Sequence, residues 1–227
     1  MESRTTVLYK LLKSLTKTEI LKYARKTCKH YHSLIAHPEC LKQELGKEKR
    51  VGFLDIETSN LVATYGYIIS YCIKEFNGKI IEDVMNKEDF VSGNFDKRVV
   101  GNLVNDLKKF DKVYTYYGVR FDLPFIRSRA VYHGYDFPIY KEVAHTDLYF
   151  IMRNKFKLHS NRLGTVCDFF GIKAKGHPLT PKVWHRAATG DKKALNYILI
   201  HNREDVDSTE KLYKKIIHFS GDNNTSI

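Results

Sequence analysis

The stretch that most constrains the fold of this chain is Val51–Thr58, with the sequence VGFLDIET. It has the features of a short buried strand that ends in two acids, Asp55 and Glu57. Side chains two positions apart in a strand point to the same side of the sheet. Burying two unpaired carboxylates on one face is costly, and a pair of divalent cations would remove that cost because Mg²⁺ prefers carboxylate oxygens. Alternatively, the strand runs into solvent and both acids are hydrated. The same spacing of two acids recurs at Asp205-x-Asp207, so the spacing alone does not identify a metal site.

Length and charge narrow the class of protein. The 227 residues fit one domain with an extension, and 43% apolar and 28% charged residues suit a soluble globular protein. Lys and Arg outnumber Asp and Glu by 38 to 26, which gives a formal net charge of +12. Together with 15 Tyr and 13 Phe, this charge favours a nucleic-acid partner, although a solvated Lys-rich surface would have the same composition.

The chain has no feature of a secreted or membrane protein. No apolar run approaches the roughly 18 residues of a membrane span. The first residues lack the apolar core of a signal peptide. Four cysteines in 227 residues do not make a disulfide framework. The sequence therefore predicts an intracellular, cytoplasmic protein without signal peptide or transmembrane segment.

Residues 1–48 are predicted to form an N-terminal helical extension. Leu8, Leu11, Leu12 and Leu15 recur at helical spacing, and Thr16 with Glu19 forms a capping box that opens a second helix. The two helices either cover the sheet or bind nucleic acid.

A group of soft metal ligands follows these helices. Cys28, His32, His37 and Cys40 could together bind one Zn²⁺ ion. Their spacing matches no standard zinc finger, and the alternative is a polar turn with free thiols.

From residue 51 the pattern predicts an α/β fold. Strands are expected at 51–58, 64–75, 79–84 and 112–117, and helices at 96–110 and from 121. Asn77-Gly78 is a hairpin-turn signal between the second and third strands. Three antiparallel strands followed by further strands and helices indicate a mixed sheet flanked by helices.

Two later segments carry further chemistry. Asp122 follows the fourth strand, where Gly118 lets the chain turn. A late helical pattern places His201 and Asp205 four residues apart, on one face of a helix. An imidazole beside a carboxylate on that face suits a general base next to a metal ligand.

These three segments resemble the motifs of the DEDD superfamily of 3′–5′ exonucleases. The matching stretches are FLDIET from Phe53, YGVRFD from Tyr117 and HNRED from His201, with His145-Thr-Asp147-Leu between the last two. The tract PLTPKVW at 178–184, followed by Gly190-Asp191, resembles the phage and prokaryotic predicted-exonuclease branch of that superfamily.

The resemblance implies a ribonuclease H-like domain over residues 49–219, with a flexible tail at 220–227. It implies that two Mg²⁺ or Mn²⁺ ions are bound by four acids, Asp55, Glu57, Asp122 and Asp205. It also implies DNA hydrolysis from the 3′ end, with RNA as another possible substrate. His201 is the candidate base, or else a surface histidine that orients a neighbour.

The sequence departs from the family at two points. The second motif usually has Asn before the glycine, whereas this chain has Tyr117. The third motif combines the tyrosine branch's spacing with the histidine branch's residue, His201. Two other hypotheses therefore stay open: an endonuclease that cuts structured nucleic acid or RNA/DNA hybrids, and a non-catalytic nucleic-acid-binding module.

Overall fold

The computed structural model describes residues 4–13, 15–28, 30–46, 50–139, 142–173 and 176–220. The chain divides into two compact units: an N-terminal unit of residues 1–49 with 139–142, and a sheet unit of residues 50–138 with 143–227. The boundary that the sequence places between 48 and 49 lies outside the described residues. The same is true of the predicted tail at 220–227, apart from Ser220.

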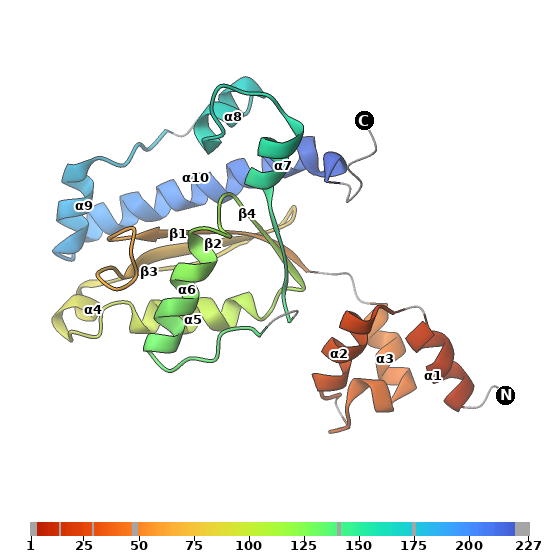
Figure 1. Ribbon diagram of the computed structural model, residues 1–227. Helices are drawn as coiled ribbons and strands as arrows, with labels where there is room; N and C mark the ends of the chain where they lie inside the picture. Colours follow the sequence, from red (N-terminus) through yellow and green to blue (C-terminus); the bar gives the residue numbers. More distant parts are fainter. Residues whose placement is uncertain are drawn as a thin grey trace. The chain divides into compact units, whose positions relative to one another are not determined.

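The N-terminal unit is helical (Figure 1). Its elements are α1 (Arg4–Lys13), α2 (Lys17–Arg25), the 3₁₀ turn η1 (Leu34–Ala36) and α3 (Pro38–Leu45). The predicted capping box is present: the Thr16 hydroxyl accepts a hydrogen bond from the Glu19 N–H, and the Thr16 N–H donates to the Glu19 carboxylate. This reciprocal pair satisfies two N–H groups that a helix start leaves without partners, and so fixes where α2 begins.

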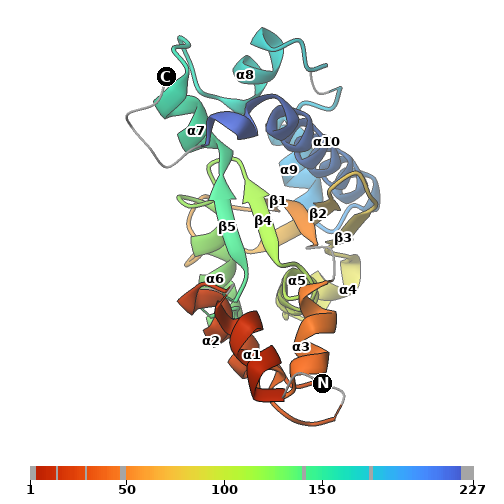
Figure 2. The ribbon, with the colours of Figure 1, turned by 90° about the vertical axis from the view of Figure 1, so that its right-hand side faces the viewer.

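The sheet unit is built on a mixed sheet in the order β3-β2-β1-β4-β5 (Figure 2). Its strands are β1 (Val51–Thr58), β2 (Ile68–Glu75), β3 (Ile80–Val84), β4 (Lys112–Thr115) and β5 (Ala144–Asp147). The first three strands pair antiparallel. β4 pairs parallel to β1, and β5 pairs parallel to β4. The prediction of an α/β fold with a mixed, helix-flanked sheet is confirmed.

Side chains of β1 alternate between the two faces of the sheet. Leu54 and Ile56 are buried in one apolar cluster and Phe53 is buried in a second one, and both clusters include side chains of the long last helix. The period of two therefore places Asp55 and Glu57 on the same face as Phe53. The strand thus has one face that is apolar at Leu54 and Ile56 and one face that changes from apolar at Phe53 to acidic at Asp55 and Glu57.

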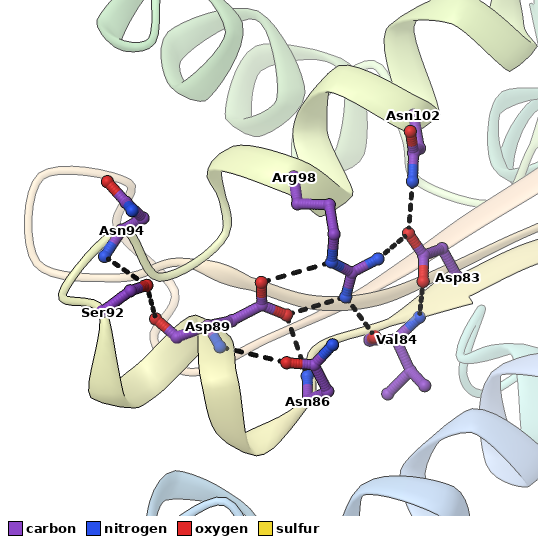
Figure 3. Close-up of polar contacts among 8 residues, drawn as sticks. All are labelled: Asp83, Val84, Asn86, Asp89, Ser92, Asn94, Arg98 and Asn102. Atoms are coloured by element: carbon purple, nitrogen blue, oxygen red, sulfur yellow. Dashed lines mark hydrogen bonds and ion pairs between the residues drawn. The ribbon is translucent and has the colours of Figure 1, made fainter.

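One face of the sheet is covered by α4 (Lys87–Val91), α5 (Lys97–Leu107) and α6 (Asp122–Tyr132). Arg98 at the start of α5 ties α4 and α5 to the end of β3 (Figure 3). Its guanidinium donates to the Asp83 and Asp89 carboxylates and to the Val84 carbonyl at distances of 2.5 to 2.8 Å. The network fixes the start of α5, whose buried Val100, Leu103 and Val104 pack against the sheet.

The other face is covered by the remaining helices, with α10 lying along it (Figure 1). These are α7 (Leu148–Lys155), α8 (Leu163–Phe169), α9 (Pro181–Ala188), α10 (Lys192–Ile216) and the 3₁₀ turn η2 (Ile217–Phe219). The Asp191 side chain caps α10 by accepting from the Ala194 N–H at 2.9 Å. Leu199, Val206 and Leu212 of α10 are buried in the same cluster as Phe53. Among the described residues, no helix is both long and apolar enough to cross a membrane.

Candidate active site

The candidate site lies where β1 ends. Because β1 and β4 are parallel, their carboxyl ends reach the same edge of the sheet, where the loops that follow them begin. Asp55 and Glu57 are near the end of β1 on the face that α10 covers. The arrangement therefore brings α10 and the loop after β4 to the two acids.

Helix α10 brings a histidine and an acid to Glu57. His201 Nε2 lies 3.6 Å from Glu57 Oε1 and 3.4 Å from Asp205 Oδ2. One ligand atom from each of these three side chains lies within 4.8 Å of the others. All three side chains are mostly buried, so the group is enclosed by protein on most sides.

The orientation of the His201 ring is fixed from its other nitrogen. Nδ1 donates a hydrogen bond to the His177 backbone carbonyl, because a carbonyl can only accept. In the neutral ring this leaves the lone pair on Nε2, the nitrogen that faces the acids. His177 is itself held by Glu204, whose carboxylate is 2.7 Å from His177 Nδ1. The imidazole thus presents an acceptor nitrogen to the site.

Asp55 is held by a residue that the sequence analysis did not single out. Asn202 Nδ2 donates to Asp55 Oδ2 at 2.6 Å, and Asn202 is fully buried. A signal for this role is present in the sequence: Asn202 lies four residues after Ile198 and four before Val206, on the buried stripe of α10. The roles of His177 and Glu204 have no such signal, because the contact to His201 is made by a backbone carbonyl.

Asp122 reaches the same place from the start of α6. Its Oδ1 accepts a hydrogen bond from the Ile56 N–H at 3.1 Å, between the two acids of β1. The preceding loop needs Gly118, since a Cβ there would lie 2.4 Å from Thr115 Oγ1. Asp147 at the end of β5 orders that loop by accepting from the Tyr117 and Val119 N–H groups. The loop geometry thereby delivers a buried carboxylate to β1.

The pKa of Asp122 is raised by burial and by neighbouring negative charge. Burial is the main cause that raises the pKa of Asp122 to about 7, and the charges of Asp147 and Asp205 raise it further. The hydrogen bonds from the Ile56 and Asp122 N–H groups act in the opposite direction but do not outweigh burial. A bound cation would lower the pKa of Asp122, because positive charge favours the ionised carboxylate.

The five residues that the sequence analysis predicted as catalytic or as Mg²⁺ or Mn²⁺ ligands thus all lie around the end of β1. They are Asp55, Glu57, Asp122, His201 and Asp205. The donor set is mainly carboxylate oxygen, which suits a hard cation such as Mg²⁺ or Mn²⁺. The residues present therefore fit divalent cations, and the arrangement can hold charge, orient water and accept a proton.

The candidate zinc ligands lie within the N-terminal unit. Cys28, His37 and Cys40 gather there, and the fourth member of the group is His30. His32, which the sequence analysis placed in the set, is outside the group whose ligand atoms lie within 4.8 Å of one another. Its ring centroid is 6.0 Å from that of His37, compared with 4.7 Å for His30.

Comparison with known proteins identifies relatives of the sheet unit. A family model described as the RNase H superfamily matches residues 52–217. A DNA polymerase of Methanocaldococcus jannaschii is 31% identical over 169 residues, which cover 66% of this chain and 9% of the polymerase. The structure of the family B DNA polymerase from Pyrobaculum calidifontis has a similar fold, with a TM-score of 0.61 and 20% identity. That match covers 75% of this chain and 25% of that one.

Proposed function

The chain belongs to the RNase H superfamily, and from this premise we propose that it is a metal-dependent 3′–5′ exonuclease. Its reaction is hydrolysis of phosphodiester bonds of DNA from the 3′ end, with release of nucleoside 5′-monophosphates, and RNA is the alternative substrate. One observation carries the proposal. His201 Nε2 faces Glu57 and Asp205 at the end of β1, where Asp55 and Asp122 also lie.

The carboxylates are proposed as the ligands of two Mg²⁺ or Mn²⁺ ions. The ligands are Asp55, Glu57, Asp122 and Asp205. When bound, such ions lower the pKa of a water and stabilise charge on the leaving oxygen. Asn202 keeps the Asp55 carboxylate in one orientation through its 2.6 Å hydrogen bond. Partners of this kind orient metal ligands and raise metal affinity.

His201 is proposed as the general base. Its Nδ1–H is engaged by the His177 carbonyl, so in the neutral ring the Nε2 lone pair faces the acids. A water that attacks phosphorus must lose a proton, and Nε2 is placed to accept it. Neutral imidazole is suited to this step near pH 7.

Side chains around the site provide candidate contacts for a nucleic-acid strand. Both loops at this edge of the sheet carry exposed large side chains: Leu61, Val62 and Tyr65 after β1, and Tyr117 and Val119 after β4. Exposed aromatic rings can stack on nucleobases without sequence preference. The net charge of +12 adds attraction to phosphates. Tyr117, the departure from the family motif, is thus proposed to contact the terminal base.

The relatives favour DNA as the first substrate to test, since both are named DNA polymerases. The match covers only 9% of the first and 25% of the second. The comparison therefore supports a nuclease module, and polymerisation is not proposed for this chain.

The test uses linear single-stranded DNA carrying a 5′-end label, with Mg²⁺ or Mn²⁺. Wild type is expected to shorten the labelled strand stepwise and release 5′-mononucleotides. Asp205→Asn is expected to abolish this. Asp207→Asn is the matched control, because Asp207 lies on the same helix and pairs with Lys74 and Lys211 outside the cluster. Equal rates in the two variants would contradict the proposal.

A circular single-stranded substrate separates the alternatives. An exonuclease leaves a covalently closed circle intact, because it needs an end. Internal cleavage of the circle would instead show the structure-specific or hybrid endonuclease. Binding of DNA with no hydrolysis of any substrate, in either metal, would show the non-catalytic module.

A further inference from the structure

We propose that Cys28, His30, His37 and Cys40 bind one structural zinc ion in the N-terminal unit. The inference does not rest on the proposed nuclease activity, since all four residues lie outside the sheet unit. It changes the ligand set expected from sequence spacing by replacing His32 with His30.

Two ligands come from a tight turn and two from the start of a helix. The Cys28 N–H donates to the His32 carbonyl at 2.8 Å, and the Tyr31 N–H donates to the Cys28 carbonyl at 2.9 Å. Tyr31 has a φ of 61°, so the backbone reverses in the left-handed region. This turn brings His30 back over Cys28. His37 is the N-cap residue of α3, and Cys40 lies in its first turn.

The distances within the group match tetrahedral coordination. His30 Nδ1 is 3.9 Å from Cys28 Sγ and 3.4 Å from Cys40 Sγ. Zinc bonds of about 2.3 Å to sulfur and 2.0 Å to nitrogen, at tetrahedral angles, would separate sulfur and nitrogen ligands by about 3.6 Å. All four ligand atoms lie within 4.8 Å of one another. One ion can therefore reach them with only small side-chain shifts.

A polar atom in the group is unexplained without a metal. Nδ1 of His37 is buried and has no hydrogen-bond partner among the described residues. Contacts between thiol and imidazole account for His30, Cys28 and Cys40, but they leave this nitrogen unsatisfied. A buried polar atom without a partner is costly, and coordination would remove that cost.

The size of the unit supplies a reason for the ion. Among the described residues of this unit, six partly buried side chains pack against an apolar cluster whose five buried members are Tyr23, Cys28, Leu34, Cys40 and Leu41. Two of the five are the cysteines themselves. Units of this length seldom bury enough apolar surface to fold alone, and a structural metal is one of the common remedies.

The chemistry of the donors selects the metal. Two thiolates and two imidazoles in a tetrahedral arrangement are typical of Zn²⁺, whereas Mg²⁺ and Mn²⁺ prefer oxygen. Four protein ligands leave no open position for water or substrate, which is the mark of a structural site. The ion would tie the turn at 28–32 to the start of α3.

The competing explanation for the two cysteines is a disulfide. Neither forms a disulfide in the structure, although they lie close together. A disulfide would leave His30 and His37 without a function in the group, and it would form without metal. The two explanations therefore differ in metal content and in thiol count.

The test measures zinc in the full-length chain, purified under reducing conditions, by inductively coupled plasma mass spectrometry. Wild type is expected to carry one zinc ion per chain. His30→Asn is expected to lose it, while His32→Asn, the matched control two residues away, is expected to keep it. Loss in His32→Asn with retention in His30→Asn would overturn the ligand set in favour of the sequence-based one.

A second measurement on wild type guards against variants that fail to fold. Exchange of the zinc for Co²⁺ is expected to give the intense visible absorption of tetrahedral cobalt and a thiolate charge-transfer band. Both should disappear when excess Zn²⁺ is added. A chain without zinc, with Cys28 and Cys40 joined in a disulfide by mass spectrometry, would overturn the proposal outright.

Discussion

The two units of this molecule gather their candidate metal ligands in opposite ways. In the sheet unit, the acids come from β1, α6 and α10, which are far apart in the sequence and are held by an apolar core on both faces of a sheet. In the N-terminal unit, Cys28, His30, His37 and Cys40 fall within thirteen consecutive residues, and the two cysteines are themselves part of a small core. In the sheet unit, the apolar core holds the candidate ligands in place. In the N-terminal unit, we propose that folding itself depends on the ligands binding zinc.

The two proposed kinds of ion would have different roles. Carboxylates on a preformed scaffold can release and rebind hard cations without unfolding, which suits a catalytic site. A closed set of sulfur and nitrogen ligands in a minimal core couples binding to folding. Each prediction below tests one side of this contrast.

The largest expected effect is on the N-terminal unit when zinc is removed. A zinc-selective chelator, added with excess Mg²⁺ present, should unfold that unit, since structural zinc contributes on the order of 10 kcal/mol. Hydrogen exchange by mass spectrometry is expected to rise across residues 30–46 and to stay unchanged in β2 (68–75). Equal loss of protection in both regions would contradict the claim that zinc stabilises the N-terminal unit alone.

Next in size is the effect of replacing the candidate base. His201→Gln removes the acceptor at Nε2, and the single-turnover rate of DNA hydrolysis should fall by roughly 10²- to 10³-fold. His185→Gln, an exposed histidine on α9, is the control. A His201 variant with a wild-type rate would show that the ring has only a structural role.

Asp122 gives the sheet unit a pH-dependent stability when divalent cations are absent. Its pKa of about 7 in the folded chain lies above the value of about 3.9 in an unfolded chain. Between these two values, Asp122 is protonated in the folded chain and ionised in the unfolded chain. The stabilisation that this proton gives is fully present below about pH 4 and is lost as pH rises through 7. The loss is a few kcal/mol, with about 4 as the upper bound.

Urea unfolding at several pH values, without Mg²⁺ or Mn²⁺, checks this expectation. Asp122→Asn should remove the downward slope, and added Mn²⁺ should remove it in wild type. A wild-type curve that runs parallel to that of Asp122→Asn would show that the Asp122 carboxyl does not titrate as described.

The smallest effect is expected at Asn202. Asn202→Ala removes the hydrogen bond to Asp55, and the Mn²⁺ concentration that gives half-maximal hydrolysis should rise roughly 10- to 100-fold. Asn196→Ala, exposed on the same helix, should leave it unchanged. An unchanged metal requirement in Asn202→Ala would remove this residue from the account of the site.

The mixed sheet could be predicted from the sequence because strands and helices follow periodic patterns, whereas the role of its acids as metal ligands stays a prediction. Alternation in β1 and the four-residue spacing of His201 and Asp205 fix which side chains share a face, whatever the connecting loops do. β5 was not predicted as a strand, because Ala144–Asp147 has only four residues without apolar alternation. β2 begins at Ile68 rather than 64, since the preceding residues form a loop closed by the Ser59 and Tyr67 backbones.

The choice between His30 and His32 could not be made from the sequence. It depends on one backbone reversal at Tyr31, a residue type that seldom adopts positive φ, and no periodic pattern reports such a turn. The contact between His201 and the His177 carbonyl could not be predicted either, because any residue at 177 supplies the same carbonyl.

The most direct test of the central claim is a Mn²⁺ titration of the zinc-loaded full-length chain, followed by electron paramagnetic resonance. The account predicts two bound Mn²⁺ ions per chain in wild type and in Asp207→Asn, and loss of binding in Asp205→Asn. A wild-type chain that binds no Mn²⁺, or an Asp205→Asn chain that binds it as wild type does, would contradict it.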